Sequence, residues 1–218
     1  MPIAAKPTKY GQYTFRSQLE ARWALFFDLL GIRYCYEPKL FRLQPGLSYL
    51  PDFWLIDHHC FVEVKGAKPE QREKMRLLAR NVRVNVYTFF GDVGVPDPVH
   101  CRGAIVDHGD DFYFAIDTTP DPIRIRYPLI RPGQLPMQPH LLNAYGRWGR
   151  DYGWCECQQC GMVVIATTNP TIRWQCACPE PLLAPHTMHS SRMIAAYCAA
   201  NQHRFISQLT PDARLKAS

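Results

Sequence analysis

The fold of this chain is decided by Tyr49-Leu-Pro-Asp-Phe-Trp-Leu-Ile56 and, three residues later, Cys60-Phe-Val-Glu-Val-Lys65. Both runs are rich in the aromatic and branched residues that favour strands, and the polar residues 57–59 between them indicate a turn. The sequence therefore predicts two paired strands. Because side chains two apart on a strand point to one face, Glu63 and Lys65 are expected on the same face.

An amphipathic helix is predicted before these strands, over residues 17–30. Gly31 follows it, as expected of a residue that ends a helix. Residues 32–43 then suit a strand, in which Pro38 must take an edge or bulge position. The apolar residues of the helix recur at the spacing of one helical face, and they are Leu19, Trp23, Phe26, Phe27 and Leu30.

More elements follow the paired strands. Residues 69–80 predict a helix with Pro69 near its first turn and a basic face, and residues 82–90 predict a strand. Residues 103–117 suit a hairpin. This order predicts an α/β fold, with a mixed central sheet flanked by helices, in a domain over residues 1–117.

The rest of the chain has a different composition. Six prolines fall within residues 118–139, so we expect residues 118–150 to form a linker or an extended wrap. Residues 151–185 are rich in cysteine and are expected to form a small zinc-ribbon domain. In the last segment, 186–218, a helix is predicted near 189–207, with Met193, Tyr197 and Phe205 among its apolar positions.

Composition excludes several classes of protein. Of the 218 residues, 47% are hydrophobic and 20% are charged, which excludes a disordered chain. The net charge of +6 is compatible with a polyanionic partner, and most of the excess lies in residues 1–95. Met1 to Tyr10 lacks the apolar stretch of a secretory signal, and no apolar run could span a bilayer. We therefore expect a cytoplasmic protein without a membrane partner, whose cysteines are thiols or metal ligands.

Two acids and a lysine indicate a catalytic site. Asp52 and Glu63 lie on strands apolar enough to be buried, where a carboxylate costs several kcal/mol unless its charge is compensated. A divalent cation such as Mg²⁺ or Mn²⁺ is the natural compensator, and Lys65 could stabilise developing negative charge or position a water. Separately, Pro-Asp is a common turn and Glu-Val-Lys is ordinary strand alternation; their combination favours the site. Glu20 has two interpretations, because Ser17-x-x-Glu20 also fits a capping box.

Pro51-Asp52 followed by Glu63-Val64-Lys65, with Glu20 on the preceding helix, resembles the PD-(D/E)XK nucleases. Over residues 13–92 the pattern is most similar to the phage Holliday-junction resolving endonucleases. The resemblance implies a restriction-endonuclease-like core, with Asp52 and Glu63 as metal ligands, Glu20 completing the metal shell and Lys65 assisting catalysis.

The function that this resemblance implies is a Mg²⁺-dependent DNA endonuclease, in which a metal-activated water attacks the phosphodiester. One alternative is a homodimeric junction resolvase. Another, of a different class, is a non-catalytic DNA-binding or recruitment module that retains the fold. The small size and modular build suggest a phage or mobile-element protein. The basic helix could contact the DNA backbone or simply be solvated, and its candidate contacts are Lys68, Arg72, Lys74 and Arg76.

A structural zinc site is predicted from the cysteine-rich segment. Cys-x-x-Cys followed by Gly is typical of a zinc knuckle, and a second cysteine pair follows. Cys155, His186 or His189 could replace one ligand, and unliganded thiols are the alternative. We expect the other cysteines (35, 60, 101 and 198) to be buried, and His58 and His59 to lie on the surface. The predicted zinc ligands are Cys157, Cys160, Cys176 and Cys178.

Overall fold

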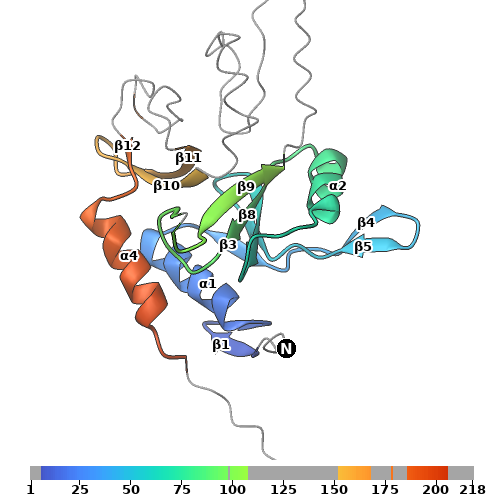
Figure 1. Ribbon diagram of the computed structural model, residues 1–218, viewed down its shortest axis with the longest axis horizontal. Helices are drawn as coiled ribbons and strands as arrows, with labels where there is room; N and C mark the ends of the chain where they lie inside the picture. Colours follow the sequence, from blue (N-terminus) through green and yellow to red (C-terminus); the bar gives the residue numbers. More distant parts are fainter. Residues whose placement is uncertain (1–5, 98, 108–151, 168–177, 179–185, 206–218) are drawn as a thin grey trace, which may run out of the picture.

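The computed structural model describes residues 6–97, 99–107, 152–167, 178 and 186–205. The paired strands are present as β6 (Phe53–Leu55) and β7 (Cys60–Lys65), which run antiparallel. Together with β3 (Tyr34–Tyr36), β8 (Val86–Phe90) and β9 (Gly103–Asp107) they form a sheet of order β3-β6-β7-β8-β9. The β7–β8 pair is parallel and the other neighbours are antiparallel, so the predicted mixed sheet is confirmed (Figure 1).

The first predicted helix is also confirmed. Helix α1 (Gln18–Leu30) begins after Ser17, whose side chain accepts a hydrogen bond from the amide of Glu20. It ends at Gly31, which has a φ of 70°. Such a left-handed conformation suits glycine, which has no side chain to clash. Its apolar face is buried, except that Leu19 is half-buried.

Helix α1 and the next helix in the chain, α2 (Glu73–Val82), cover opposite faces of the sheet, because alternate side chains of a strand point to opposite faces. On β7, Val62 and Val64 belong to the core cluster that contains the α1 side chains. Phe61 belongs to the cluster on the other face, with Leu78 of α2. The helix α2 connects the parallel strands β7 and β8. The core is thus two layers of side chains with the acidic strand between them.

The predicted strand over 32–43 is wrong in its extent. It is divided into β3 and β4 (Phe41–Gln44), because the chain turns between them at Glu37, which has a φ of 45°, and Pro38. The strand β4 pairs with β5 (Leu47–Tyr49) in a separate two-stranded hairpin near α2 (Figure 1).

Two further bounds differ from the prediction. The helix α2 begins at Glu73 rather than Pro69, with Arg72 as an N-cap that makes no side-chain cap hydrogen bond. The predicted strand 82–90 begins later, at Val86, because Val82 is still the last residue of α2 and Arg83 is its C-cap. An N-terminal hairpin of β1 (Thr8–Tyr10) and β2 (Tyr13–Phe15) was not predicted.

The C-terminal elements pack against α1. A small sheet has the order β11-β10-β12, from β10 (Tyr152–Cys157), β11 (Val163–Thr167) and β12 (His186–Thr187). It is followed by α4 (Ser191–Gln202), which contacts α1 (Figure 1). Trp154 is fully buried, and its ring stacks on Phe89 of the central sheet at 5.8 Å. The predicted zinc-ribbon segment therefore shares its core with the predicted nuclease domain.

The prediction that His58 lies on the surface is wrong. Its side chain is buried because β11 covers the turn, and the ring Nε2 lies 2.9 Å from the carbonyl oxygen of Val163. His59 is exposed, as expected. Among the four cysteines predicted to be buried, Cys60 is buried and Cys35 is half-buried, whereas two are exposed because they lie in a tight turn and on the outer side of α4: Cys101 and Cys198.

Some predictions fall outside the described residues: the segment 118–150, residues 108–117 of the predicted hairpin, and Cys176. None of the helices in the described part of the chain combines the length and the apolar character that a membrane crossing needs.

Candidate active site and metal centre

Asp52 and Glu63 are brought together by the pairing of β6 with β7. Asp52 comes directly before β6, and the register places Phe53 opposite Val62. The amide of Asp52 donates to Glu63 Oε2 at 3.3 Å, and the amide of Val64 donates to Asp52 Oδ2 at 2.8 Å. The two carboxylates are 1% and 2% exposed as residues. Each acid is thus held in place by a backbone group beside the other.

Burial raises the pKa of Asp52, and the neighbouring Glu63 charge raises it further. Two carboxylates in one desolvated site repel each other, so the proton is held more tightly unless positive charge is supplied. This is the electrostatic condition under which a cation binds favourably.

Lys65 supplies part of that positive charge. Its ammonium group forms an ion pair with Glu63 Oε1, and its side chain is 39% exposed. Burial works against the charged form, but the carboxylates of Glu63 and Asp52 outweigh it and raise the pKa of Lys65. Lys65 is therefore a cation at neutral pH, suited to stabilising negative charge rather than to accepting a proton.

Tyr49, which sequence reasoning missed, lies beside the same carboxylates. Burial raises the pKa of its phenol, and the charge of Glu63 adds to the effect. It ends β5, so the hairpin that contains β4 and β5 reaches the site. The only sequence signal for it was its position three residues before Asp52.

Glu20 has the contacts of a helix cap. Its Oε1 accepts a hydrogen bond from the Ser17 hydroxyl at 2.8 Å, and its Oε2 accepts from the Tyr36 hydroxyl at 2.5 Å and from the Arg16 amide at 3.1 Å. Glu20 therefore takes part in the N-terminal cap of α1, but its carboxylate accepts from the amide of Arg16, whereas a capping box uses the amide of the N-cap residue, here Ser17. The role of Glu20 as a metal ligand stays a prediction.

Arg16 links Glu20 to the pair of acids. Its Nη2 lies 2.5 Å from Asp52 Oδ1, and its Nε lies 2.8 Å from Glu37 Oε1 and 3.9 Å from Glu20 Oε2. No local sequence pattern marks the pairs that Arg16 forms with Glu37 and Asp52, because these partners are distant along the chain. Lys65 thus contacts Glu63 directly, and the backbone amide of Asp52 contacts Glu63 as well. Glu20, the fourth predicted catalytic residue, is linked to them through Arg16.

The carboxylate site fits a hard divalent cation. Its donors are carboxylate oxygens, which Mg²⁺ and Mn²⁺ prefer. Asp52 Oδ1 and Glu63 Oε1 already attract side-chain cations, from Arg16 and Lys65. The donor atoms are thus of the type that the predicted ion takes, and binding of that ion stays a prediction.

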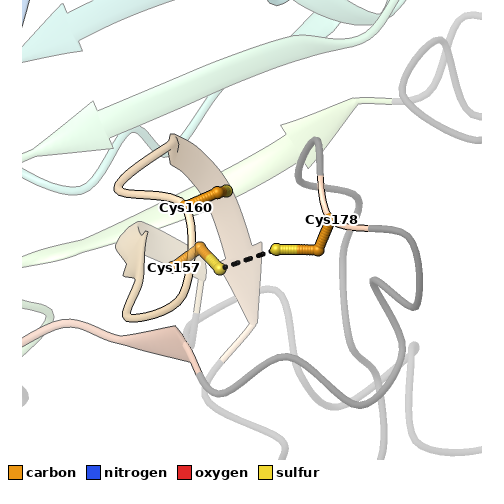
Figure 2. A group of neighbouring side chains, drawn as sticks. All are labelled: Cys157, Cys160 and Cys178. Atoms are coloured by element: carbon orange, nitrogen blue, oxygen red, sulfur yellow. Dashed lines mark hydrogen bonds between the residues drawn. The ribbon is translucent and has the colours of Figure 1, made fainter.

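Three of the four predicted zinc ligands lie together. The Sγ atoms of Cys157, Cys160 and Cys178 are within 4.8 Å of one another, and those of Cys157 and Cys178 are 3.6 Å apart (Figure 2). Gly161 donates from its amide to the Cys157 carbonyl at 2.8 Å, which closes the turn between the first two cysteines. Three sulfur atoms at this spacing can hold one metal ion.

The proposed substitutes for a zinc ligand are placed differently. Cys155 packs in the main core and is not in the sulfur cluster. His186 lies opposite Cys157 in the β10–β12 pair, and His189 is exposed.

The candidate DNA contacts in and just before α2 include both paired and exposed cations. Arg72 Nη1 lies 3.0 Å from Asp107 Oδ1, and Arg76 Nε lies 3.6 Å from the same oxygen, so these residues tie α2 to the end of β9. Lys68 and Lys74 are exposed. Contact of any of the four with DNA stays a prediction.

Comparisons with known proteins add no relative: no protein-family model matches the chain, and no curated protein or solved structure matches it significantly.

Proposed function

We propose that this protein is a divalent-metal-dependent DNA endonuclease that hydrolyses phosphodiester bonds, with a restriction-endonuclease-like core. The observation that carries the proposal is the contact between Asp52, Glu63 and Lys65 at the β6–β7 pair. Two buried acids and a charged lysine occur in the order of the PD-(D/E)XK motif. Burying these charges costs folding free energy, and such groups cluster at functional sites.

In this proposal Asp52 and Glu63 hold Mg²⁺ or Mn²⁺, and Glu20 completes the metal shell. The bound ion would polarise the phosphate and lower the pKa of a coordinated water. Lys65 stabilises the negative charge that develops on the phosphate, because it carries a fixed positive charge beside Glu63. Burial of the two acids keeps these interactions strong, since few water molecules screen them.

We further propose that the sulfur cluster binds a structural zinc ion. Cys157, Cys160 and Cys178 would supply three ligands, and Cys176 or His186 the fourth. A site closed by four protein ligands has no open position for chemistry.

One observation favours a non-catalytic DNA-binding module instead. Arg16 and Lys65 place a positive charge on each of the two buried acids, so the site is compensated without a metal. Such a module would bind DNA and cut none. A homodimeric junction resolvase is the narrower form of the enzyme proposal, with branched DNA as its substrate.

The test is a cleavage assay on linear, nicked, single-stranded and four-way-junction DNA, with Mg²⁺, Mn²⁺ or EDTA. Wild-type protein is compared with Glu63→Gln and with the matched control Glu70→Gln, an exposed residue outside the site. We expect metal-dependent cleavage that Glu63→Gln abolishes and Glu70→Gln preserves. Cutting confined to junctions would favour the resolvase, and DNA binding without cutting under any metal would favour the module.

A further inference from the structure

The backbone of Arg16 is held by hydrogen bonds, whereas its long side chain is largely exposed. Its amide donates to Glu20 Oε2 at 3.1 Å and to the Tyr36 hydroxyl at 3.0 Å, directly before the N-cap of α1. Its side chain is 53% exposed, although it reaches a carboxylate that is almost wholly buried. The guanidinium group can therefore move while its attachment point stays in place.

The guanidinium group is shared between an inner and an outer acid. On Asp52, Oδ2 is occupied by the Val64 amide, so Oδ1 is the oxygen left for a cation, and Arg16 Nη2 lies 2.5 Å from it. The outer acid is Glu37, whose Oε1 lies 2.8 Å from Arg16 Nε. The side chain of Glu37 is 28% exposed, and its amide donates to the Asp52 carbonyl at 2.8 Å, which keeps it beside the site.

A divalent cation and a guanidinium group compete for the same oxygen. Two positive groups this close repel each other, and the repulsion is strong where little water screens it. If the cation takes Asp52 Oδ1, Arg16 still has Glu37 as a partner and loses only one of its two close ion pairs.

We propose that Arg16 is a displaceable counter-ion of the acidic site: it occupies Asp52 Oδ1 in the metal-free protein and yields this oxygen to the divalent cation. Arg16 thereby lowers the affinity for the metal and stabilises the metal-free fold. This inference rests on the proposed function in one respect, which is that Asp52 and Glu63 bind a divalent cation. It adds a positioning residue that the motif does not contain.

Two measurements of opposite sign test the proposal. Removing Arg16 should tighten metal binding, because the competitor is gone, and should lower the stability of the metal-free protein, because Asp52 then lacks its partner. A merely structural role for Arg16 would lower stability without tightening metal binding.

The experiment is calorimetric titration of Mn²⁺ into the full chain without DNA, for wild type, Arg16→Gln and Arg16→Lys. The matched control is Arg33→Gln, which removes an exposed arginine paired with Asp57. Heat that remains in Asp52→Asn belongs to other sites and is subtracted. Thermal unfolding of the same proteins is measured in EDTA and in saturating Mn²⁺.

We expect Arg16→Gln to bind Mn²⁺ about tenfold more tightly than wild type, which is the effect of removing about one ion pair. Arg16→Lys should fall between them, since lysine keeps the charge but not the fork that spans two acids. The Arg16→Gln melting temperature should be below wild type in EDTA, with a smaller difference in Mn²⁺, and Arg33→Gln should match wild type in affinity.

Equal or weaker Mn²⁺ binding by a folded Arg16→Gln would overturn the role of Arg16 and leave the proposed metal site intact. If that variant does not fold, Arg16→Lys decides by the same criterion. If no protein, wild type included, binds Mn²⁺ in a manner that needs Asp52, both the counter-ion role and the metal-dependent function fail.

Discussion

The backbone amide of Asp52 donates a hydrogen bond to the carboxylate of Glu63, eleven positions later in the chain. This contact joins the residue just before β6 to the middle of β7, and the group that orients the Glu63 carboxylate is a backbone amide. The geometry of the site therefore depends on strand pairing, and changes to the side chains of the site should alter chemistry more than fold.

Lys65→Met is expected to reduce DNA cleavage about 100- to 1000-fold, because one preorganised positive group beside the reacting phosphate is lost. Binding of DNA to the basic surface should change little. Single-turnover cleavage and a binding assay in Ca²⁺ measure the two effects. Lys9→Met, which changes an exposed lysine on β1, is the control. Unchanged cleavage by Lys65→Met would favour the non-catalytic module.

Tyr36→Phe should lower the free energy of unfolding by about 1–3 kcal/mol, as expected for loss of a buried hydrogen bond to a charged group. The Tyr36 hydroxyl donates to Glu20 and accepts from the Arg16 amide, so one atom holds both the helix cap and the counter-ion. Urea denaturation measures the change. Tyr34→Phe, in the same strand, is the control and should be milder; an equal loss in both variants would contradict this explanation.

Zinc removal should destabilise the whole chain, because the sulfur cluster and α1 are physically connected. Arg192 of α4 donates to the carbonyl of Gly161, beside Cys160, at 3.1 Å and to the carbonyl of Leu30, the last residue of α1, at 2.8 Å. Elemental analysis should give about one zinc per chain in wild type and in Cys198→Ser, and far less in Cys178→Ser. Zinc content near zero in wild type would dismiss the site.

Stability should fall as the pH is lowered from 7 to 5, in part because of His58. Burial lowers its pKa from the ordinary value of 6.5. The unfolded chain then takes up a proton near pH 6.5 that the folded protein does not, so unfolding becomes easier below that pH. The ring Nδ1 is buried and has no hydrogen-bond partner among the described residues, so a proton there would lack an acceptor within that part of the chain.

The measurement is urea denaturation at several pH values for wild type, His58→Gln and His59→Gln. His58→Gln should flatten the decline between pH 7 and 5, whereas His59→Gln, which changes an exposed residue, should retain it. A decline of the same size in all three proteins would assign it to other groups.

Local patterns predicted the elements that local interactions form. The helix α1 was found because its apolar spacing lies between Ser17 and Gly31, and both residues act as its caps. The β6–β7 pair was found because a short polar turn separates two strongly strand-forming runs. The prediction over 32–43 failed because Pro38 and the positive φ of Glu37 divide a run that composition alone would make continuous.

Long-range contacts were not predictable in this way. Arg16 meets Asp52 across 36 positions, and His58 meets Val163 across 105. A single sequence contains no periodic signal for either contact. The two acids and the lysine were found only because a known motif joins them, whereas Arg16, Tyr36 and Tyr49 belong to no such motif.

The burial of Trp154 against Phe26, Phe27 and Phe89 has a practical consequence. Trp154 follows the predicted linker in sequence, yet it fills space under the first helix, so Trp154→Ala should cost about 3–5 kcal/mol. A break in the chain between residues 107 and 152 would therefore leave these buried ring contacts to hold the two parts together. Expressed separately, each part would expose aromatic side chains that are buried in the whole chain and would aggregate. Refolding the two parts together would restore solubility.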